Sequence, residues 1–347
     1  MKSQPLRRQI TVAGALAALA VITGVAVAAT SSPTLPVSTA PIPKPAPERA
    51  ITSVAPGSVL TVPIDALRPT QPAIGYDQVY ASLERYRRNP QEKFDDYCFI
   101  NGQRGVNAYD AAVSRLDTPS SFSCKQDAPE AASAHAATLH GVVIGPGGRM
   151  YLQSGHHSLA TLVALPDGGA QLPLHVRVVA NYSQMAPSAF WTRMAAERRV
   201  WLRDEMARMI VPESLPHSFR MGDMRDDPYR SLVFFTRGIG YERPQGATPH
   251  VELTWAAWLR KRRDPDLSDV ALDSVTAYRD AVILAARKMV ALRDNDILID
   301  RSTALSLGKL KSFDASDNLR KLTREGTATQ SPGPLLDALA WKQRMAR

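Results

Sequence analysis

The stretch MYLQSGHHSLATL, residues 150–162, decides how the middle of this chain folds. A short apolar run leads into a tight Ser-Gly turn, and an apolar stretch with helical spacing follows. The pattern predicts a strand, a turn and a helix, with the adjacent His156 and His157 at the helix N-terminus. Unpaired backbone N–H groups and the helix dipole favour anions at such a position. We therefore expect a phosphate group to bind at this turn.

A purely structural interpretation of the turn stays open. Adjacent histidines also occur as ordinary capping or core residues, and Ser154 could simply be the N-cap of the helix. The two interpretations differ in whether the start of the helix faces an open cleft or the interior of the protein.

The segments around the turn predict an α+β domain with a mixed sheet. Strand patterns occur at residues 59–65, 140–144, 149–152 and 172–180, and helical patterns at 75–88 and 157–165. Residues 89–133 are polar and rich in loop-forming residues, so they read as an insertion.

The chain after residue 186 predicts a helical C-terminal half. Helices are expected at residues 187–209, 229–235, 253–259 and 270–292, with a last amphipathic helix at 335–345. In the first of these, aromatic residues alternate with arginines. That composition suits base stacking and phosphate binding, but it is also typical of a helix that buries its aromatics and exposes its arginines.

The turn resembles the signature box of the ParB/sulfiredoxin superfamily. Four further pieces occur in the order seen in its branch of ParB-like nucleases: Leu67–Gln71 with Gly75 and Val79, Phe190–Trp191 with Met194, Asp226–Leu232, and Trp255 with Trp258–Arg260. Together they cover roughly residues 58–290. The resemblance implies a ParB/sulfiredoxin-like mixed sheet core with a helical C-terminal half, and a phosphodiester hydrolase activity.

Three positions depart from other branches of the superfamily. His156 stands where sulfiredoxin has its cysteine, so thiol chemistry is not expected. The serine-kinase branch has an acid at the position of Ser154 and a basic residue at the position of Ser158. A nucleotide-dependent phosphotransferase is therefore disfavoured.

The predicted phosphate site is built on the turn. Gly155 lets the main chain approach a ligand, Ser158 adds a hydroxyl, and His156 or His157 would supply a cation or a general acid and base near neutral pH. Arg68 would line the same pocket if the first strand lies beside the box.

Asp226, Asp227 and Arg230 are the expected supplement to this site. Paired carboxylates could act as a base or hold a divalent metal ion, and Arg230 could bind a phosphate through two hydrogen bonds. The alternative is structural: Asp227 and Pro228 would be the N-cap and first residue of a helix, with Arg230 in an ion pair. The sequence has no closely spaced metal ligands of the kind that hold a permanent zinc ion.

The first residues predict export. Lys2, Arg7 and Arg8 precede an almost wholly apolar run at 12–25, and Ala26–Ala28 offers a small-residue cleavage site. We expect a signal peptide at residues 1–28 and a periplasmic or secreted protein. An uncleaved inner-membrane anchor facing the periplasm is the alternative, because the run reaches about 18 residues.

Charge and cysteine content fit an exported protein. Removal of Lys2, Arg7 and Arg8 would lower the formal net charge from +9 to +6, which still favours polyanions such as nucleic acid. A generic basic protein is equally consistent with this charge.

Cys98 and Cys124 are expected to form a disulfide in an oxidising compartment.

The domain organisation follows from these features. A Pro/Ser/Thr-rich linker at residues 29–57 precedes the ParB/sulfiredoxin-like domain with its helical extension at 58–293, and a polar tail with a terminal helix follows at 294–347. The leading hypothesis is an exported ParB-like nuclease that binds a phosphate-bearing ligand. A catalytically inactive periplasmic binding or interaction module is the alternative.

Overall fold

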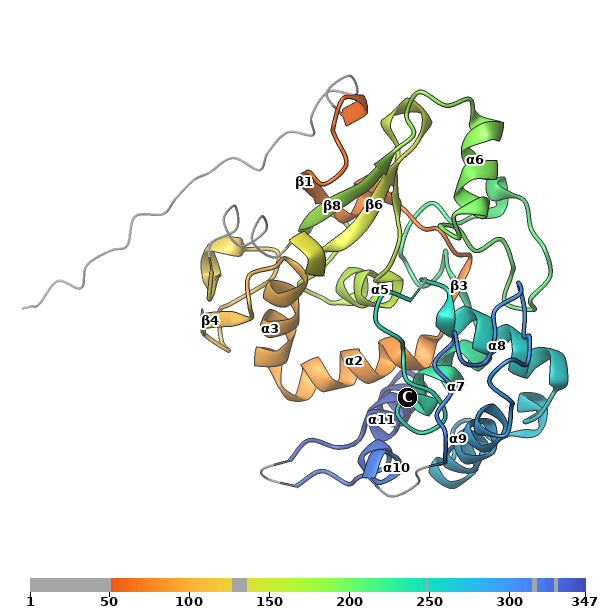
Figure 1. Ribbon diagram of the computed structural model, residues 1–347. Helices are drawn as coiled ribbons and strands as arrows, with labels where there is room; N and C mark the ends of the chain where they lie inside the picture. Colours follow the sequence, from red (N-terminus) through yellow and green to blue (C-terminus); the bar gives the residue numbers. More distant parts are fainter. Residues whose placement is uncertain (1–50, 127–135, 248, 314–316, 328–329) are drawn as a thin grey trace, which may run out of the picture. The chain divides into compact units, whose positions relative to one another are not determined.

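A five-stranded mixed sheet forms the N-terminal half of the folded chain (Figure 1). Its strands, in spatial order, are β1 (Val59–Pro63), β8 (Pro173–Asn181), β6 (His140–Ile144), β7 (Met150–Leu152) and β2 (Leu67–Arg68). The β8–β6 and β7–β2 pairs are parallel, and the other two pairs are antiparallel. The predicted strands and the α+β fold class are confirmed.

The computed structural model describes residues 51–126, 136–247, 249–313, 317–327 and 330–347. The predicted signal peptide at 1–28 and residues 29–50 of the predicted linker lie outside the described residues. Within them, no helix is long and apolar enough to cross a membrane.

Alternate residues of the central strands pack on opposite faces of the sheet, as the period of two in a strand requires. Val142 and Ile144 belong to the core formed with α2 (Tyr76–Arg88), α3 (Pro90–Ile100) and α5 (His156–Ala164). Val143 and Tyr151 point to the other face, where they pack against α6 (Pro187–Ala196). The Gly-His-His turn joins β7 to α5 and therefore lies at the edge of the first core.

The C-terminal half is helical, and its own core contains Trp255 and Tyr278. It comprises α7 (Pro228–Thr236), α8 (Val251–Arg262), α9 (Val275–Val290), α10 (Asp317–Leu322) and α11 (Pro334–Met345). Helix α11 packs along α2 (Figure 1), where Lys342 forms an ion pair with Asp77 at 2.7 Å.

Smaller elements connect these parts. They are the parallel pair β3 (Ala73–Ile74) and β9 (Arg225–Asp226), the antiparallel pair β4 (Val106–Tyr109) and β5 (Phe122–Cys124), and short 3₁₀ segments at Ile64–Ala66, Pro119–Ser121, Ala136–Thr138, Pro146–Gly148, Pro212–Ser214 and Leu267–Asp269. The β3–β9 pair connects the segment that follows β2 to the start of α7.

The structure corrects the predicted helix at 187–209, because α6 ends at Ala196. Arg198 adopts a left-handed backbone conformation with φ of 53°, and the Trp201 N–H then donates to the Thr70 carbonyl at 2.8 Å. The Trp201 ring packs with Leu253 of α8. A long-range contact thus overrides the local helical pattern.

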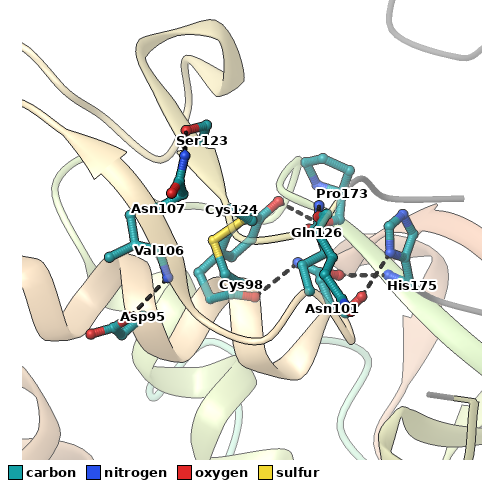
Figure 2. The surroundings of a disulfide bond; sticks show 12 residues. Asp95, Cys98, Asn101, Val106, Asn107, Ser123, Cys124, Gln126, Pro173 and His175 are labelled. Carbon is teal, nitrogen blue, oxygen red and sulfur yellow. Dashed lines mark hydrogen bonds between the residues drawn. A yellow bond between two sulfur atoms is a disulfide. The ribbon is translucent and has the colours of Figure 1, made fainter. Parts of the chain in front are cut away.

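A second correction concerns residues 89–133, which were expected to be a loop. They contain α3, which begins with Pro90 as its first residue and buries Phe94, Tyr97 and Cys98 on one face. Cys98 is joined to Cys124 in the expected disulfide, with a Cα–Cα distance of 5.6 Å (Figure 2). The disulfide links the last turn of α3 to β5, as Figure 2 shows.

Candidate functional site

Gly155 makes the turn between β7 and α5 possible for two reasons. Its φ of 91° lies in the left-handed region, and a Cβ atom at this position would come within 2.3 Å of the His140 ring. Gly155 is also the N-cap of α5 and has no side chain to cap it, so Ser154 is not the cap. Helix α5 begins at His156, one residue before the predicted start at 157, and both histidines lie in its first turn as expected.

Both histidine rings are turned toward the interior. His156 is 4% exposed and His157 is 8% exposed. The His156 Nε2 accepts the Thr70 N–H at 3.1 Å, and the His157 Nε2 accepts the Gly75 N–H at 3.0 Å. The two rings therefore attach the chain between β2 and α2 to the start of α5.

These hydrogen bonds define the protonation state of the rings. A nitrogen that accepts carries no hydrogen, so each ring is neutral with its hydrogen on Nδ1. Burial lowers the pKa of His156 to about 3, and burial also lowers the pKa of His157, assisted by the charge of Arg230. Neither ring carries a positive charge near neutral pH. Their catalytic role stays a prediction, whereas their contact with the main chain is observed.

A cavity of about 320 Å³ lies in front of the turn. Part of its wall comes from the turn and part from the helical half. The wall includes Gly155, His156, His157 and Ser158 together with Arg230, Arg237, Arg243 and Glu252. The structure thus brings Arg230 to the turn, as predicted.

Glu252 is the buried carboxylate of this cavity. It forms ion pairs with Arg237 at 2.5 Å and with Arg243 at 2.6 Å. Burial alone would raise its pKa, but Arg230, Arg243 and Arg237 together hold the pKa below its usual value. Glu252 is therefore ionised near neutral pH and orients two guanidinium groups.

Arg230 is the buried cation of the cavity. It belongs to the first turn of α7, is 7% exposed, and its Nη1 is buried without a hydrogen-bond partner. Burial lowers its pKa, and the nearby Glu252 opposes this effect. The cavity wall thus has three arginines and the carboxylate of Glu252, which leaves an excess of positive charge beside the N-terminus of α5.

Sequence reasoning missed Arg237, Arg243 and Glu252. The one available signal was Glu252 itself, because it is the only charged residue in the largely apolar run 251–259. A carboxylate in such a run needs a buried partner. The sequence does not indicate which arginines provide it.

The structure does not bring Asp226 and Asp227 to the wall of this cavity. Asp226 accepts the Tyr76 N–H at 2.9 Å at the start of α2. Asp227 caps α7 by accepting the Tyr229 and Arg230 N–H groups, and it pairs with Arg260 at 2.6 Å. The structural alternative is confirmed for Asp227 as N-cap and Pro228 as first residue. Its expected ion pair of Arg230 is wrong, because the arginine that pairs with Asp227 is Arg260. The catalytic role of both carboxylates stays a prediction.

Arg68 also lies outside this cavity. Its Nη1 donates to the carbonyls of Asp65 at 2.8 Å and His217 at 3.2 Å, and its side chain lines a separate cavity. Arg68 lies at the end of β2, and the chain bends at residues 70–72 before it reaches β3. Arg68 and Gln71 thus line different cavities. Within the described part of the chain, no three His, Cys, Asp or Glu side chains gather as metal ligands.

Comparison with known protein families shows the family of this chain. A family model described as "Putative ParB-like nuclease" matches residues 60–261, more than half of the 347 residues. The chain belongs to this family. The resemblance drawn from the turn and the pieces around it is thereby confirmed.

The ParB-like chain is also similar to a solved structure. This is the crystal structure of protein Atu1540 from Agrobacterium tumefaciens, with a TM-score of 0.44 and 25% sequence identity over 66% of this chain and 90% of that chain. Curated protein sequences gave no match.

The buried imidazoles predict a stability that falls in acid. The pKa of His156 is about 3 in the folded protein and 6.5 in its reference state, so the unfolded chain binds a proton first as the pH falls. The contribution of His156 is complete above about pH 6.5 and is lost toward pH 3, at about 1.4 kcal/mol per pH unit. Urea unfolding between pH 7 and pH 4 measures this slope.

His156→Gln should flatten that slope, because an amide oxygen can accept the Thr70 N–H and does not titrate. His217→Gln is the matched control, since His217 is exposed. Equal slopes for the wild type and His156→Gln would contradict the assignment of a neutral, buried ring.

Proposed function

We propose that this ParB-like protein binds a phosphate-bearing ligand in the cavity at the Gly-His-His turn. The observation that carries the proposal is Arg230, a buried guanidinium whose Nη1 has no hydrogen-bond partner and which lines the cavity beside the start of α5. A buried guanidinium nitrogen without a hydrogen-bond partner is costly, and a bound anion that accepts its hydrogen would offset that cost.

The other residues of the cavity wall also favour an anionic ligand. Arg237 and Arg243 contact Glu252 and are thereby held at the wall of the cavity. Guanidinium groups match the geometry of phosphate oxygens, and the first N–H groups of a helix can donate hydrogen bonds to such a ligand. Gly155 and Ser158 of the turn line the same cavity.

The histidines have a different role in this proposal from the one the sequence suggested. Being neutral, His156 and His157 would not supply the charge that binds the phosphate. They would hold the turn and the segment at Thr70–Gly75 in place, while the three arginines supply the positive charge.

Titration calorimetry with inorganic phosphate tests the proposal. Arg230→Met should weaken phosphate binding about 10- to 100-fold, because a charged hydrogen bond contributes roughly 1.5–3 kcal/mol. Arg243→Gln, at a less buried position, should also weaken phosphate binding. It keeps the test valid if Arg230→Met does not fold. Arg208→Gln is the matched control, since it removes an equal charge at an exposed site. No binding by the wild type, or equal binding by all variants, would contradict the proposal.

Phosphodiester hydrolysis is the second candidate, and membership of the ParB-like nuclease family favours it. It predicts that the protein cleaves a fluorescently labelled oligonucleotide in the presence of Mg²⁺ or Mn²⁺, and that Arg230→Met lowers the rate. Phosphate binding without cleavage under any of these conditions would instead support a catalytically inactive binding module.

We further propose that the protein is exported. The charged and apolar pattern of residues 1–28 supports this, and so does the Cys98–Cys124 disulfide, since disulfides persist mainly in oxidising compartments. Expression of the full chain followed by fractionation should yield a periplasmic or secreted protein that begins at Ala29 and has no free thiols. Recovery in the membrane fraction with residues 1–28 intact would favour the anchored alternative, and a cytosolic protein with free thiols would contradict export.

A further inference from the structure

We propose that a second cavity, bordered by β7, α6 and the loop at 212–217, binds the nucleobase and phosphate of a mononucleotide. This cavity has a volume of about 550 Å³ and is separate from the cavity at the Gly-His-His turn. It contains Arg68, Tyr151 and Trp191, which the proposed function leaves unused. The proposal goes beyond that function and does not depend on it.

An aromatic wall suits the nucleobase. Trp191 lies edge-on to Tyr151, with ring centroids 5.2 Å apart, and edge-on to Phe190 at 4.8 Å. Phe190 and Tyr151 are buried in the core between α6 and the sheet, so they fix the orientation of the Trp191 ring. Trp191 itself is only half-buried and lines the cavity. A fixed aromatic ring at the wall of an open cavity can stack on any base.

Two arginines suit the phosphate. Arg68 is held by the carbonyls of Asp65 and His217, and Arg149 is exposed at the start of β7. Neither forms an ion pair with a carboxylate of the described residues. Both charges act on the Tyr151 hydroxyl: burial raises the pKa of Tyr151, and Arg149 and Arg68 oppose that rise. The two guanidinium groups therefore lie at the same end of the aromatic wall.

The remaining wall is rigid and of suitable size. Pro69, Pro187, Pro212 and Pro216 line the cavity, and their restricted backbones lower the entropy that would be lost when a ligand binds. The exposed Glu213 also lies on the wall and offers an acceptor for an amino or imino group of a base. The volume lies within the range of about 300–1,000 Å³ that is usual for small-molecule sites.

These features distinguish a nucleotide from other occupants. A free phosphate would not use the aromatic wall, and an uncharged ring would not use Arg68 and Arg149. A ligand with both an aromatic ring and an anionic group uses all of these residues. Mononucleotides have this chemistry, and thymidine 5′-monophosphate is the probe we choose because its thymine has an N–H donor for Glu213.

Titration calorimetry of the full chain with thymidine 5′-monophosphate tests the proposal, with ribose 5-phosphate as the probe without a base. Trp191→Leu should weaken binding of thymidine 5′-monophosphate by at least about 10-fold, in line with the contribution of base stacking. It should leave binding of ribose 5-phosphate unchanged. Arg149→Gln, at an exposed position where folding is not at risk, should weaken thymidine 5′-monophosphate binding about 10-fold as well, and Arg208→Gln should have no effect.

The Arg230→Met variant separates this proposal from the proposed function. If the second site is real, Arg230→Met still binds thymidine 5′-monophosphate, and Trp191→Leu and Arg149→Gln reduce that binding. If Arg230→Met abolishes all binding of thymidine 5′-monophosphate while Trp191→Leu and Arg149→Gln retain it, the second site is refuted and the first stands. Equal affinity of the wild type and Trp191→Leu for this nucleotide would also overturn the proposal.

Discussion

Two buried hydrogen bonds hold the site together: the Thr70 N–H to the His156 Nε2, and the Gly75 N–H to the His157 Nε2. A buried N–H without an acceptor would cost roughly 1–3 kcal/mol, so the segment between β2 and α2 is strongly constrained. Gly155 completes the arrangement because its backbone conformation and its contact with His140 both exclude a side chain. The start of α5 and the start of α2 therefore depend on the same pair of imidazoles.

The constrained segment also separates the two cavities. Arg68 and Pro69 line the cavity beside α6, whereas Gln71 lines the cavity at the Gly-His-His turn. Thr70 lies between them, with its N–H bonded to His156 and its carbonyl bonded to the Trp201 N–H. A change at Thr70 would therefore disturb both walls, although its side chain lines neither cavity.

Charge is distributed differently in the two cavities. At the Gly-His-His turn, Arg237 and Arg243 pair with the carboxylate of Glu252, and the Nη1 of Arg230 is buried without a hydrogen-bond partner. Beside α6, Arg68 and Arg149 flank an aromatic wall. The first arrangement suits a compact anion, and the second suits an anion attached to a ring. The two cavities of this ParB-like protein therefore differ in the surroundings of their guanidinium groups.

Local periodicity predicted the strand, turn and helix around Gly155, the mixed α+β class and a helix start at the two histidines. The disulfide between Cys98 and Cys124 could be predicted because the chain has only two cysteines. The inward orientation of both imidazoles, the end of α6 at Ala196 and the place of Glu252, Arg237 and Arg243 beside the turn became visible only in the folded chain. Those outcomes depend on contacts between residues far apart in the chain, which no local pattern encodes.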